Sequence, residues 1–229
     1  YIVCDRVVIP EDHHDHYSEK VVYLPDTFQA NDSKRRIAER TPTRAEAGLP
    51  DEGFVFCSFN QPYKFTPAMF DIWMRVLGRV EGSVLWLQES NATAPGNLRR
   101  EAAQRGIDGR RLVFAPRVPR LEDHLARYRL ADLFVDTLPY NAHVTASDAL
   151  WAGLPVITCL GTTFVGRVAA SLLAAAGLPE LITHSLAEYE ALALRLATDR
   201  VMLAGVKAKL ARNRDTCALF DTDRIRRHI

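Results

Sequence analysis

From residue 53 onward, short apolar runs alternate along the chain with stretches in which apolar residues recur every three or four positions. The apolar runs predict strands at 54–59, 83–87, 111–115, 133–136, 155–159 and, in a shorter run, 180–182. The periodic stretches predict helices at 67–80, 96–106, 121–130, 145–152, 164–176, 186–197 and 200–213. Nearly all strand positions are apolar, as is typical of strands covered on both faces. The pattern therefore predicts an α/β fold with a parallel, Rossmann-like sheet between two layers of helices.

The first 50 residues follow a different pattern. An apolar run at 1–9 and a second one at 21–24 flank a polar, histidine-rich stretch. Residues 26–50 are polar and rich in proline, which indicates a linker or a long connection. These boundaries divide the chain into residues 1–25, a linker at 26–50 and a lobe at 51–229.

Composition excludes several classes of protein. With a formal net charge of +1 in 229 residues, nothing favours a nucleic-acid partner. The longest apolar stretches, such as 168–176, are far shorter than the ~20 residues of a membrane-spanning helix, so we expect no membrane partner. The four cysteines are widely spaced without a CxxC pair, which favours reduced thiols and a cytoplasmic setting over a disulfide framework. The chain begins at Tyr1 and shows no signal segment, so we expect a piece of a longer protein.

Ligands of open parallel sheets bind beyond the carboxyl ends of the strands. The loop after the first strand carries Gln61 and Lys64 close to a helix start, where amides and a cation suit an anion. The alternative is a polar surface loop. Further along, His124 and Arg127 are three residues apart and share one helix face, where they could hold a flat base, with Arg120 close by. The alternative is a solvated helix start.

The run at 133–153, LFVDTLPYNAHVTASDALWAG, is the most informative. Its loop, Pro139 to His143, precedes a helix that we expect to start at Thr145 and to end at Gly153. Free N–H groups at that start suit a diphosphate. The alternative is that Thr145 and Asp148 form a loose capping box and nothing more. Small residues in the next loop, 161–163, could line the same ligand site, or they could have only a packing role.

Two short motifs resemble metal sites. The run at 11–16, EDHHDH, is rich in ligand side chains, but adjacent residues rarely converge on one ion. The DxD pattern at 221–223 follows no strand, and an N-cap for a final helix explains it better. We therefore expect neither a metal nor a cofactor.

Several segments together resemble the O-GlcNAc transferase family, and bacterial members most closely. The matching segments, in order, are YSEK at 17–20, LPDTF at 24–28, FNQPYK at 59–64, SVLWL at 83–87, His124 followed by LAD at 130–132, AHVTASDALWAG at 142–153 and RVAAS at 167–171. They cover nearly the whole chain.

The resemblance implies the C-terminal lobe of a two-lobed GT-B glycosyltransferase, with residues 1–25 ending the N-terminal lobe and 215–229 forming a helix that crosses back to it. It implies inverting, metal-independent transfer of N-acetylglucosamine from UDP-GlcNAc to Ser or Thr of an acceptor protein. The partners implied are the UDP-sugar donor, the acceptor, and an N-terminal lobe and tetratricopeptide repeats outside this chain.

Carried over residue by residue, the resemblance assigns a UDP-sugar site but no general base. Lys64 would stabilise the leaving UDP, and Gln61 would contact the diphosphate. The remaining donor contacts implied are Val118 (backbone to uracil), Arg120, His124 and Arg127 (uridine), Asn141, His143, Val144 and Thr145 (phosphate loop), and Asp148 (ribose). Val144 stands where the family usually has Thr, so only a backbone contact survives there. Alternatives are a non-catalytic nucleotide-sugar or peptide-binding module, another donor sugar, or an Asn acceptor.

Overall fold

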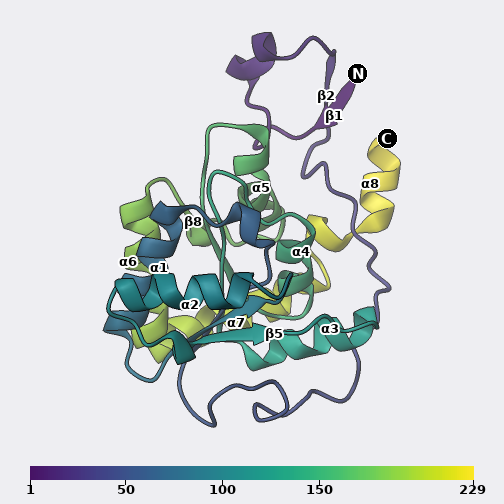
Figure 1. The fold of residues 1–229 in the computed structure, drawn as a ribbon. Coiled ribbons are helices and arrows are strands. Elements are labelled where there is room, and N and C mark those ends of the chain that lie inside the picture. The colour runs from purple at the N-terminus through teal and green to yellow at the C-terminus, as the bar shows by residue number, and fades with distance from the viewer.

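A parallel sheet of six strands forms the centre of the structure, a computed structural model that describes residues 1–229 (Figure 1). Its strands are β3 (Val55–Ser58), β4 (Val84–Gln88), β5 (Leu112–Ala115), β6 (Leu133–Val135), β7 (Val156–Cys159) and β8 (Ile182–Thr183). They lie in the order β5-β4-β3-β6-β7-β8, and every neighbouring pair is parallel. This is the doubly wound order, in which the first strand lies at the centre and the chain proceeds outward to each side in turn. The predicted fold class is confirmed.

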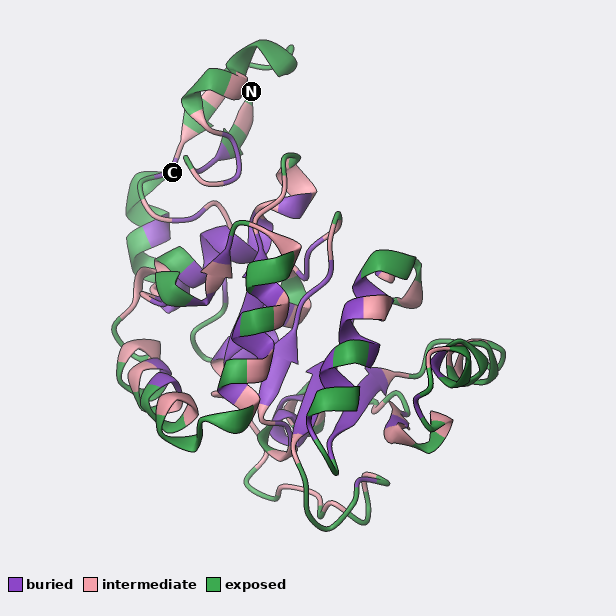
Figure 2. Ribbon diagram, turned by 90° about the vertical axis from the view of Figure 1, so that its left-hand side faces the viewer, coloured by how far each residue is buried: buried purple, intermediate pink, exposed green.

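Eight α-helices accompany the strands, and helices lie on both faces of the sheet (Figure 1). They are α1 (Pro67–Arg79), α2 (Ala94–Gln104), α3 (Leu121–Arg127), α4 (Val144–Trp151), α5 (Val168–Ala175), α6 (Leu186–Thr198), α7 (Arg200–Arg214) and α8 (Thr222–His228). Helix α1 contacts α6, while α4 contacts both α3 and α5. Figure 2 shows the strands buried between helices whose outer faces are exposed. None of these helices has both the length and the apolar character that crossing a membrane requires.

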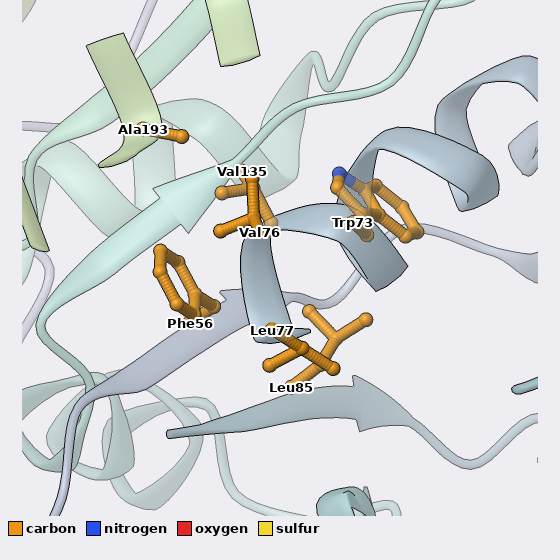
Figure 3. A pocket seen from close by; sticks show the side chains of 7 residues that line it. All are labelled: Phe56, Trp73, Val76, Leu77, Leu85, Val135 and Ala193. Atoms are coloured by element: carbon orange, nitrogen blue, oxygen red, sulfur yellow. The ribbon is translucent and has the colours of Figure 1, made fainter. Parts of the chain in front are cut away.

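Helix α1 shows why the sequence pattern was informative. Thr66 is its N-cap and accepts a hydrogen bond from Met69 N, and Pro67 occupies the first turn. Its apolar face enters the core against β3, β4, β6 and α6. Figure 3 shows the side chains that meet there, from Phe56, Trp73, Val76, Leu77, Leu85, Val135 and Ala193. The gap between them measures about 10 Å³, so this is a packed core without room for a ligand.

Three predicted elements differ from the structure. The helix expected at 121–130 ends at Arg127, and Tyr128–Leu130 forms a 3-10 turn. The strand expected at 180–182 begins only at Ile182, because Pro179–Leu181 forms a 3-10 turn closed by Leu181 N to Leu178 O. The helix expected at 164–176 is divided into a 3-10 turn, Phe164–Gly166, and α5. Between them, Arg167 turns its side chain to the carbonyl oxygens of Val7 and Gly161.

A second, two-stranded parallel sheet lies at the N-terminal end, formed by β1 (Ile2–Cys4) and β2 (Val21–Tyr23). Between β2 and β3 the chain forms no helix or strand. This segment is nevertheless held to the lobe, for example by Ala38 N donating to Glu122 O at 3.1 Å. The boundaries at residues 25 and 50 stay predictions.

Asp5, directly after β1, joins the N-terminal sheet to the lobe. Its side chain is 1% exposed. Its Oδ1 accepts hydrogen bonds from the N–H groups of Val7 and Val8, and its Oδ2 accepts from Phe28 N and from the Ser171 hydroxyl of α5, the latter at 2.6 Å. A buried carboxylate with four donors is fully satisfied and stabilises this junction.

The C-terminal helix α8 lies beside the segment that leaves β2 (Figure 1). Arg224 forms an ion pair with Asp26 at 2.6 Å, and the Thr222 hydroxyl donates to Asn31 O at 2.8 Å. Asp221 caps this helix by accepting from Arg224 N, which confirms the interpretation of the DxD pattern as an N-cap.

Candidate functional site

The centre of the candidate site is the point where the strand order reverses, between β3 and β6. The loops that leave these adjacent strands lead to opposite sides of the sheet and leave a crevice at their carboxyl ends. Asn60, after β3, contacts the β6 loop, donating to the Thr137 hydroxyl at 2.9 Å and to Asp136 Oδ1 at 3.4 Å. Its own Oδ1 accepts from the Thr145 hydroxyl of α4 at 2.7 Å. One side chain therefore links both loops and the helix.

A cleft of about 530 Å³ opens at this edge of the sheet. Its walls come from the ends of β3, β4 and β5, from α3 and from the first turn of α4. Five residues of the predicted site line it together, namely Gln61, Val118, His124, Arg127 and Thr145. The structure thus brings the predicted base-binding residues into one cavity.

His124 and Arg127, both from α3, lie side by side in the lining of that cleft. Arg127 Nη2 donates to His124 Nδ1 at 2.6 Å and to Gln88 Oε1 at 2.9 Å. Arginine is only a donor, so Nδ1 of His124 accepts and the imidazole is neutral. Burial, followed by the charge of Arg127, lowers the pKa of His124 to about 4, in agreement with this tautomer. The Arg127 guanidinium also lies over the Phe59 ring, 4.4 Å from its centre.

Lys64 lies beside the cleft, not among its lining residues. It ends a 3-10 turn, Pro62–Lys64, and is buried. Its Nζ donates to Asn141 O at 2.7 Å and lies 3.8 Å from the centre of the Tyr140 ring. Burial lowers the pKa of Lys64, and the negative charge of Asp136 acts in the opposite direction. An ammonium has three donors, so Lys64 keeps donors for a ligand.

Asp136, at the end of β6, is a site residue that the sequence reasoning missed. It is 1% exposed and accepts from the Thr158 hydroxyl at 2.7 Å and from Ala142 N at 2.6 Å. Burial raises its pKa to about 6 despite these donors and the charge of Lys64. Its position in the sequence could have predicted it, because a carboxylate that ends a central strand lies at the edge of the sheet where ligands bind.

The start of α4 differs from the prediction. The helix begins at Val144 with His143 as its N-cap residue, and no side chain caps it. The alternative interpretation, a capping box between Thr145 and Asp148, is wrong, because the Thr145 hydroxyl is held by Asn60 and the Asp148 carboxylate is paired with Arg35. Ala146 N and Ser147 N donate to His143 O at 3.1 Å, so the N–H groups of Val144 and Thr145 are the ones that remain available to an anion. The predicted end is confirmed, since Gly153 has φ +87.

The remaining predicted residues lie around this helix start. Asn141 is fully buried and its Nδ2 donates to Thr137 O at 2.8 Å, while His143 Nε2 donates to Val165 O at 3.3 Å. Val144 is 63% exposed. Arg120 does not line the cleft, because its exposed side chain pairs with Glu122 and Asp123.

The loops after β4 and β5 supply further cleft residues that were not predicted: Gln88, Glu89, Ser90 and Arg117. The same rule about carboxyl ends would have indicated them. The histidine-rich run Glu11–His16, by contrast, forms a 3-10 helix with no buried residue, and none of its residues lines the cleft.

Comparison with known proteins agrees with this geometry. The family model described as glycosyl transferase family 41 matches residues 37–229. The chain belongs to this glycosyltransferase family. It is 38% identical over 98% of its length to a probable UDP-N-acetylglucosamine–peptide N-acetylglucosaminyltransferase, SEC, of Arabidopsis thaliana, and 40% identical over 78% of its length to a UDP-N-acetylglucosamine–peptide N-acetylglucosaminyltransferase of Caenorhabditis elegans.

These family 41 relatives are much longer than this chain, which covers 23% of the Arabidopsis protein and 16% of the Caenorhabditis protein. Among solved structures, a mutant O-GlcNAc transferase of Thermobaculum terrenum superposes with a TM-score of 0.87 at 29% identity, over 99% of this chain and 44% of that one. WaaG, a glycosyltransferase involved in lipopolysaccharide biosynthesis, shares the fold at 16% identity, with a TM-score of 0.70 over 99% of this chain and 60% of that one. The C-terminal lobe of a GT-B fold is thus confirmed.

Proposed function

We propose that the protein transfers N-acetylglucosamine from UDP-GlcNAc to Ser or Thr hydroxyls of acceptor proteins, and that this chain supplies the donor-binding lobe. The single observation that carries the proposal is the cleft at the strand-order reversal, which joins a neutral His124, its partner Arg127 and the free start of α4 in one cavity. Membership of family 41 and the names of the relatives support the choice of donor and acceptor.

The uridine would occupy the part of the cleft beside His124 and Arg127. A neutral imidazole stacks on a base without the cost of desolvating a charge, and burial keeps His124 neutral. Arg127 is fixed by Gln88 and by the Pro116 carbonyl, at 2.7 Å, so its guanidinium need not be ordered when the base binds. The Val118 backbone lies on the same wall.

The diphosphate would lie across the gap between Gln61 and the first turn of α4. The free N–H groups of that turn and the helix dipole favour negative charge. Lys64, held at the Asn141 carbonyl, places a fixed cation where the leaving UDP develops charge. With a protein cation in this role, the reaction needs no metal ion to stabilise the leaving group.

Asp148 would accept from the ribose hydroxyls. The general base, the acceptor surface, the N-terminal lobe and the tetratricopeptide repeats are assigned to polypeptide outside residues 1–229. The inverting outcome follows in this proposal from direct attack by the acceptor hydroxyl on the anomeric carbon, opposite the departing UDP.

Titration calorimetry of the full-length protein with UDP tests the site. We expect binding to the wild type and at least tenfold weaker binding to Lys64→Ala and to His124→Ala. The control is Lys209→Ala, a partly exposed residue of α7 that pairs with Glu180. Unchanged affinity in both site variants would refute the assignment. UDP binding without labelling of any protein by radioactive UDP-GlcNAc would instead indicate a binding module that has lost catalysis.

A further inference from the structure

Arg35 reaches the donor site from the segment between β2 and β3. Its Nη1 forms an ion pair with Asp148 Oδ1 on α4, across 113 residues of chain. The two side chains are only 12% and 7% exposed. Shielding from water strengthens the attraction between the two charges, and removal of one partner leaves the other as an uncompensated buried charge.

Arg35 is held in place independently of Asp148. Its Nε donates to the carbonyl oxygen of Asp32 at 3.2 Å. Its own carbonyl accepts from Trp151 Nε1 at 3.1 Å, and its guanidinium carbon lies 5.8 Å from the centre of the Trp151 ring. Backbone and side chain are thus anchored to the end of α4, while the carboxylate lies one turn earlier on the same helix. The guanidinium is therefore a fixed reference for the orientation of Asp148.

The site also retains unused hydrogen-bonding capacity. Arg35 Nη2 and the hydroxyl oxygen of Tyr128 are both buried, and neither has a hydrogen-bond partner. Only Oδ1 of Asp148 takes part in the ion pair, and no hydrogen bond reaches Oδ2. None of these three residues lines the cleft itself. Buried polar atoms are almost always satisfied, so unsatisfied ones around Asp148 favour a polar ligand there.

Asp148 and the cleft are connected through helix geometry. Residues three apart lie on one face of a helix, and Thr145, three residues before Asp148, lines the cleft. Burial raises the pKa of Asp148, whereas the charge and hydrogen bond of Arg35 act in the opposite direction. The guanidinium of Arg35 therefore favours the ionised form of this carboxylate.

We propose that Arg35 is a positioning residue of the donor site, which orients the Asp148 carboxylate so that Oδ2 accepts hydrogen bonds from the vicinal hydroxyls of the donor's ribose. This inference rests on the proposed function and adds to it a residue from outside the α/β lobe. It also gives the segment at 26–50 a part in donor recognition, beyond connecting two units.

The test compares UDP with 2′,3′-dideoxy-UDP by calorimetry on the full-length protein. In Arg35→Met we expect UDP to bind about tenfold to a hundredfold more weakly, the usual effect of losing charge-assisted hydrogen bonds. We expect the dideoxy nucleotide to bind the variant and the wild type equally. The exposed neighbour Arg36 supplies the control, because Arg36→Met should leave both affinities unchanged.

Arg35→Lys keeps the positive charge but loses the planar guanidinium, which can form bidentate hydrogen bonds. It should weaken UDP by a smaller factor and again leave the dideoxy nucleotide unaffected, which keeps the test valid if Arg35→Met fails to fold. In an Asp148→Asn background, Arg35→Met should cause no further loss of UDP affinity.

Equal losses for both nucleotides would overturn the proposal, because they would indicate a purely structural ion pair. Unchanged UDP affinity in Arg35→Met would overturn it as well. Absence of UDP binding to the wild type would overturn the proposed function together with this inference, so the two failures are distinguishable.

Discussion

The ammonium of Lys64 donates a 2.7 Å hydrogen bond to the backbone carbonyl of Asn141, although the two residues are 77 positions apart in the chain. The bond connects the loop after β3 with the loop after β6 across the point where the strand order reverses. Because Asn141 N is itself held by Val165 O at 2.9 Å, the position of the ammonium is determined by two loops at once. A cation placed in this way needs little reorganisation when charge develops on a leaving group.

Replacing Lys64 by Met should therefore lower kcat more than it raises KM. We expect kcat for protein glycosylation to fall by about 10²- to 10³-fold, the usual cost of removing one fixed group that stabilises developing charge. Steady-state kinetics with UDP-GlcNAc in the full-length protein measure both constants. Lys209→Met serves as the control, and a loss confined to KM would show that Lys64 only binds the donor.

Chelation should leave turnover unchanged. In the proposed mechanism Lys64 and the first turn of α4 stabilise the diphosphate, so EDTA should not affect the rate of transfer, and added Mg²⁺ or Mn²⁺ should change it less than twofold (roughly what ionic strength alone causes). The measurement is the initial rate of glycosylation after dialysis against chelator. A rate that EDTA abolishes and Mn²⁺ restores would contradict the metal-independent mechanism.

His124 should act as a neutral group across the physiological pH range. Burial and Arg127 lower its pKa to about 4, so the imidazole stays uncharged above about pH 5. His124→Asn should thus weaken binding of UDP-GlcNAc by the same factor at every pH between about 5.5 and 8. Calorimetry at several pH values measures this factor, and a wild-type affinity that rises specifically as pH falls below about 6.5 would reveal a protonated His124 instead.

Asp136 should make the protein less stable as the pH rises. Its pKa in the folded state, about 6, exceeds the reference value of 3.8, so its contribution to stability is complete below pH 3.8 and is lost as the pH rises through 6. Between these limits the wild type should lose about 3 kcal/mol of unfolding free energy relative to Asp136→Asn, which cannot titrate. Urea denaturation of both proteins at a series of pH values tests this, and parallel pH profiles would argue against a buried, titrating carboxylate.

Much of the fold could be predicted because local pattern and tertiary packing agree in it. Helix α1 begins at Thr66 and Pro67 as expected, since both residues act through the helix's own first turn. The order of strands could not be predicted, because it depends on which faces pack together and not on any local signal. The strand expected at 180–182 begins two residues late for a local reason, since Pro179 favours a turn before it.

In the site, residues that act within one element were the predictable ones. His124 and Arg127 meet because they are three apart on one helix, and the structure confirms their contact. Asp148 could not be paired with Arg35 from the sequence, because the ion pair depends on the path of a segment that has no periodicity. Asp136 could have been found from its position after β6, but its partners could not, since they come from the loop after β3 (Asn60), its own loop (Ala142) and strand β7 (Thr158).

The four hydrogen bonds at Asp5 have a consequence for motion. The N-terminal sheet is connected to the lobe by a buried carboxylate that accepts from its own turn, from Phe28 and from Ser171 of α5. Any rotation of that sheet away from α5 has to break the bond to Ser171 and expose a charge whose donors cannot all follow it. A joint of this kind does not bend gradually. Opening of the molecule at this joint would therefore be a cooperative step, in which several hydrogen bonds of Asp5 break together.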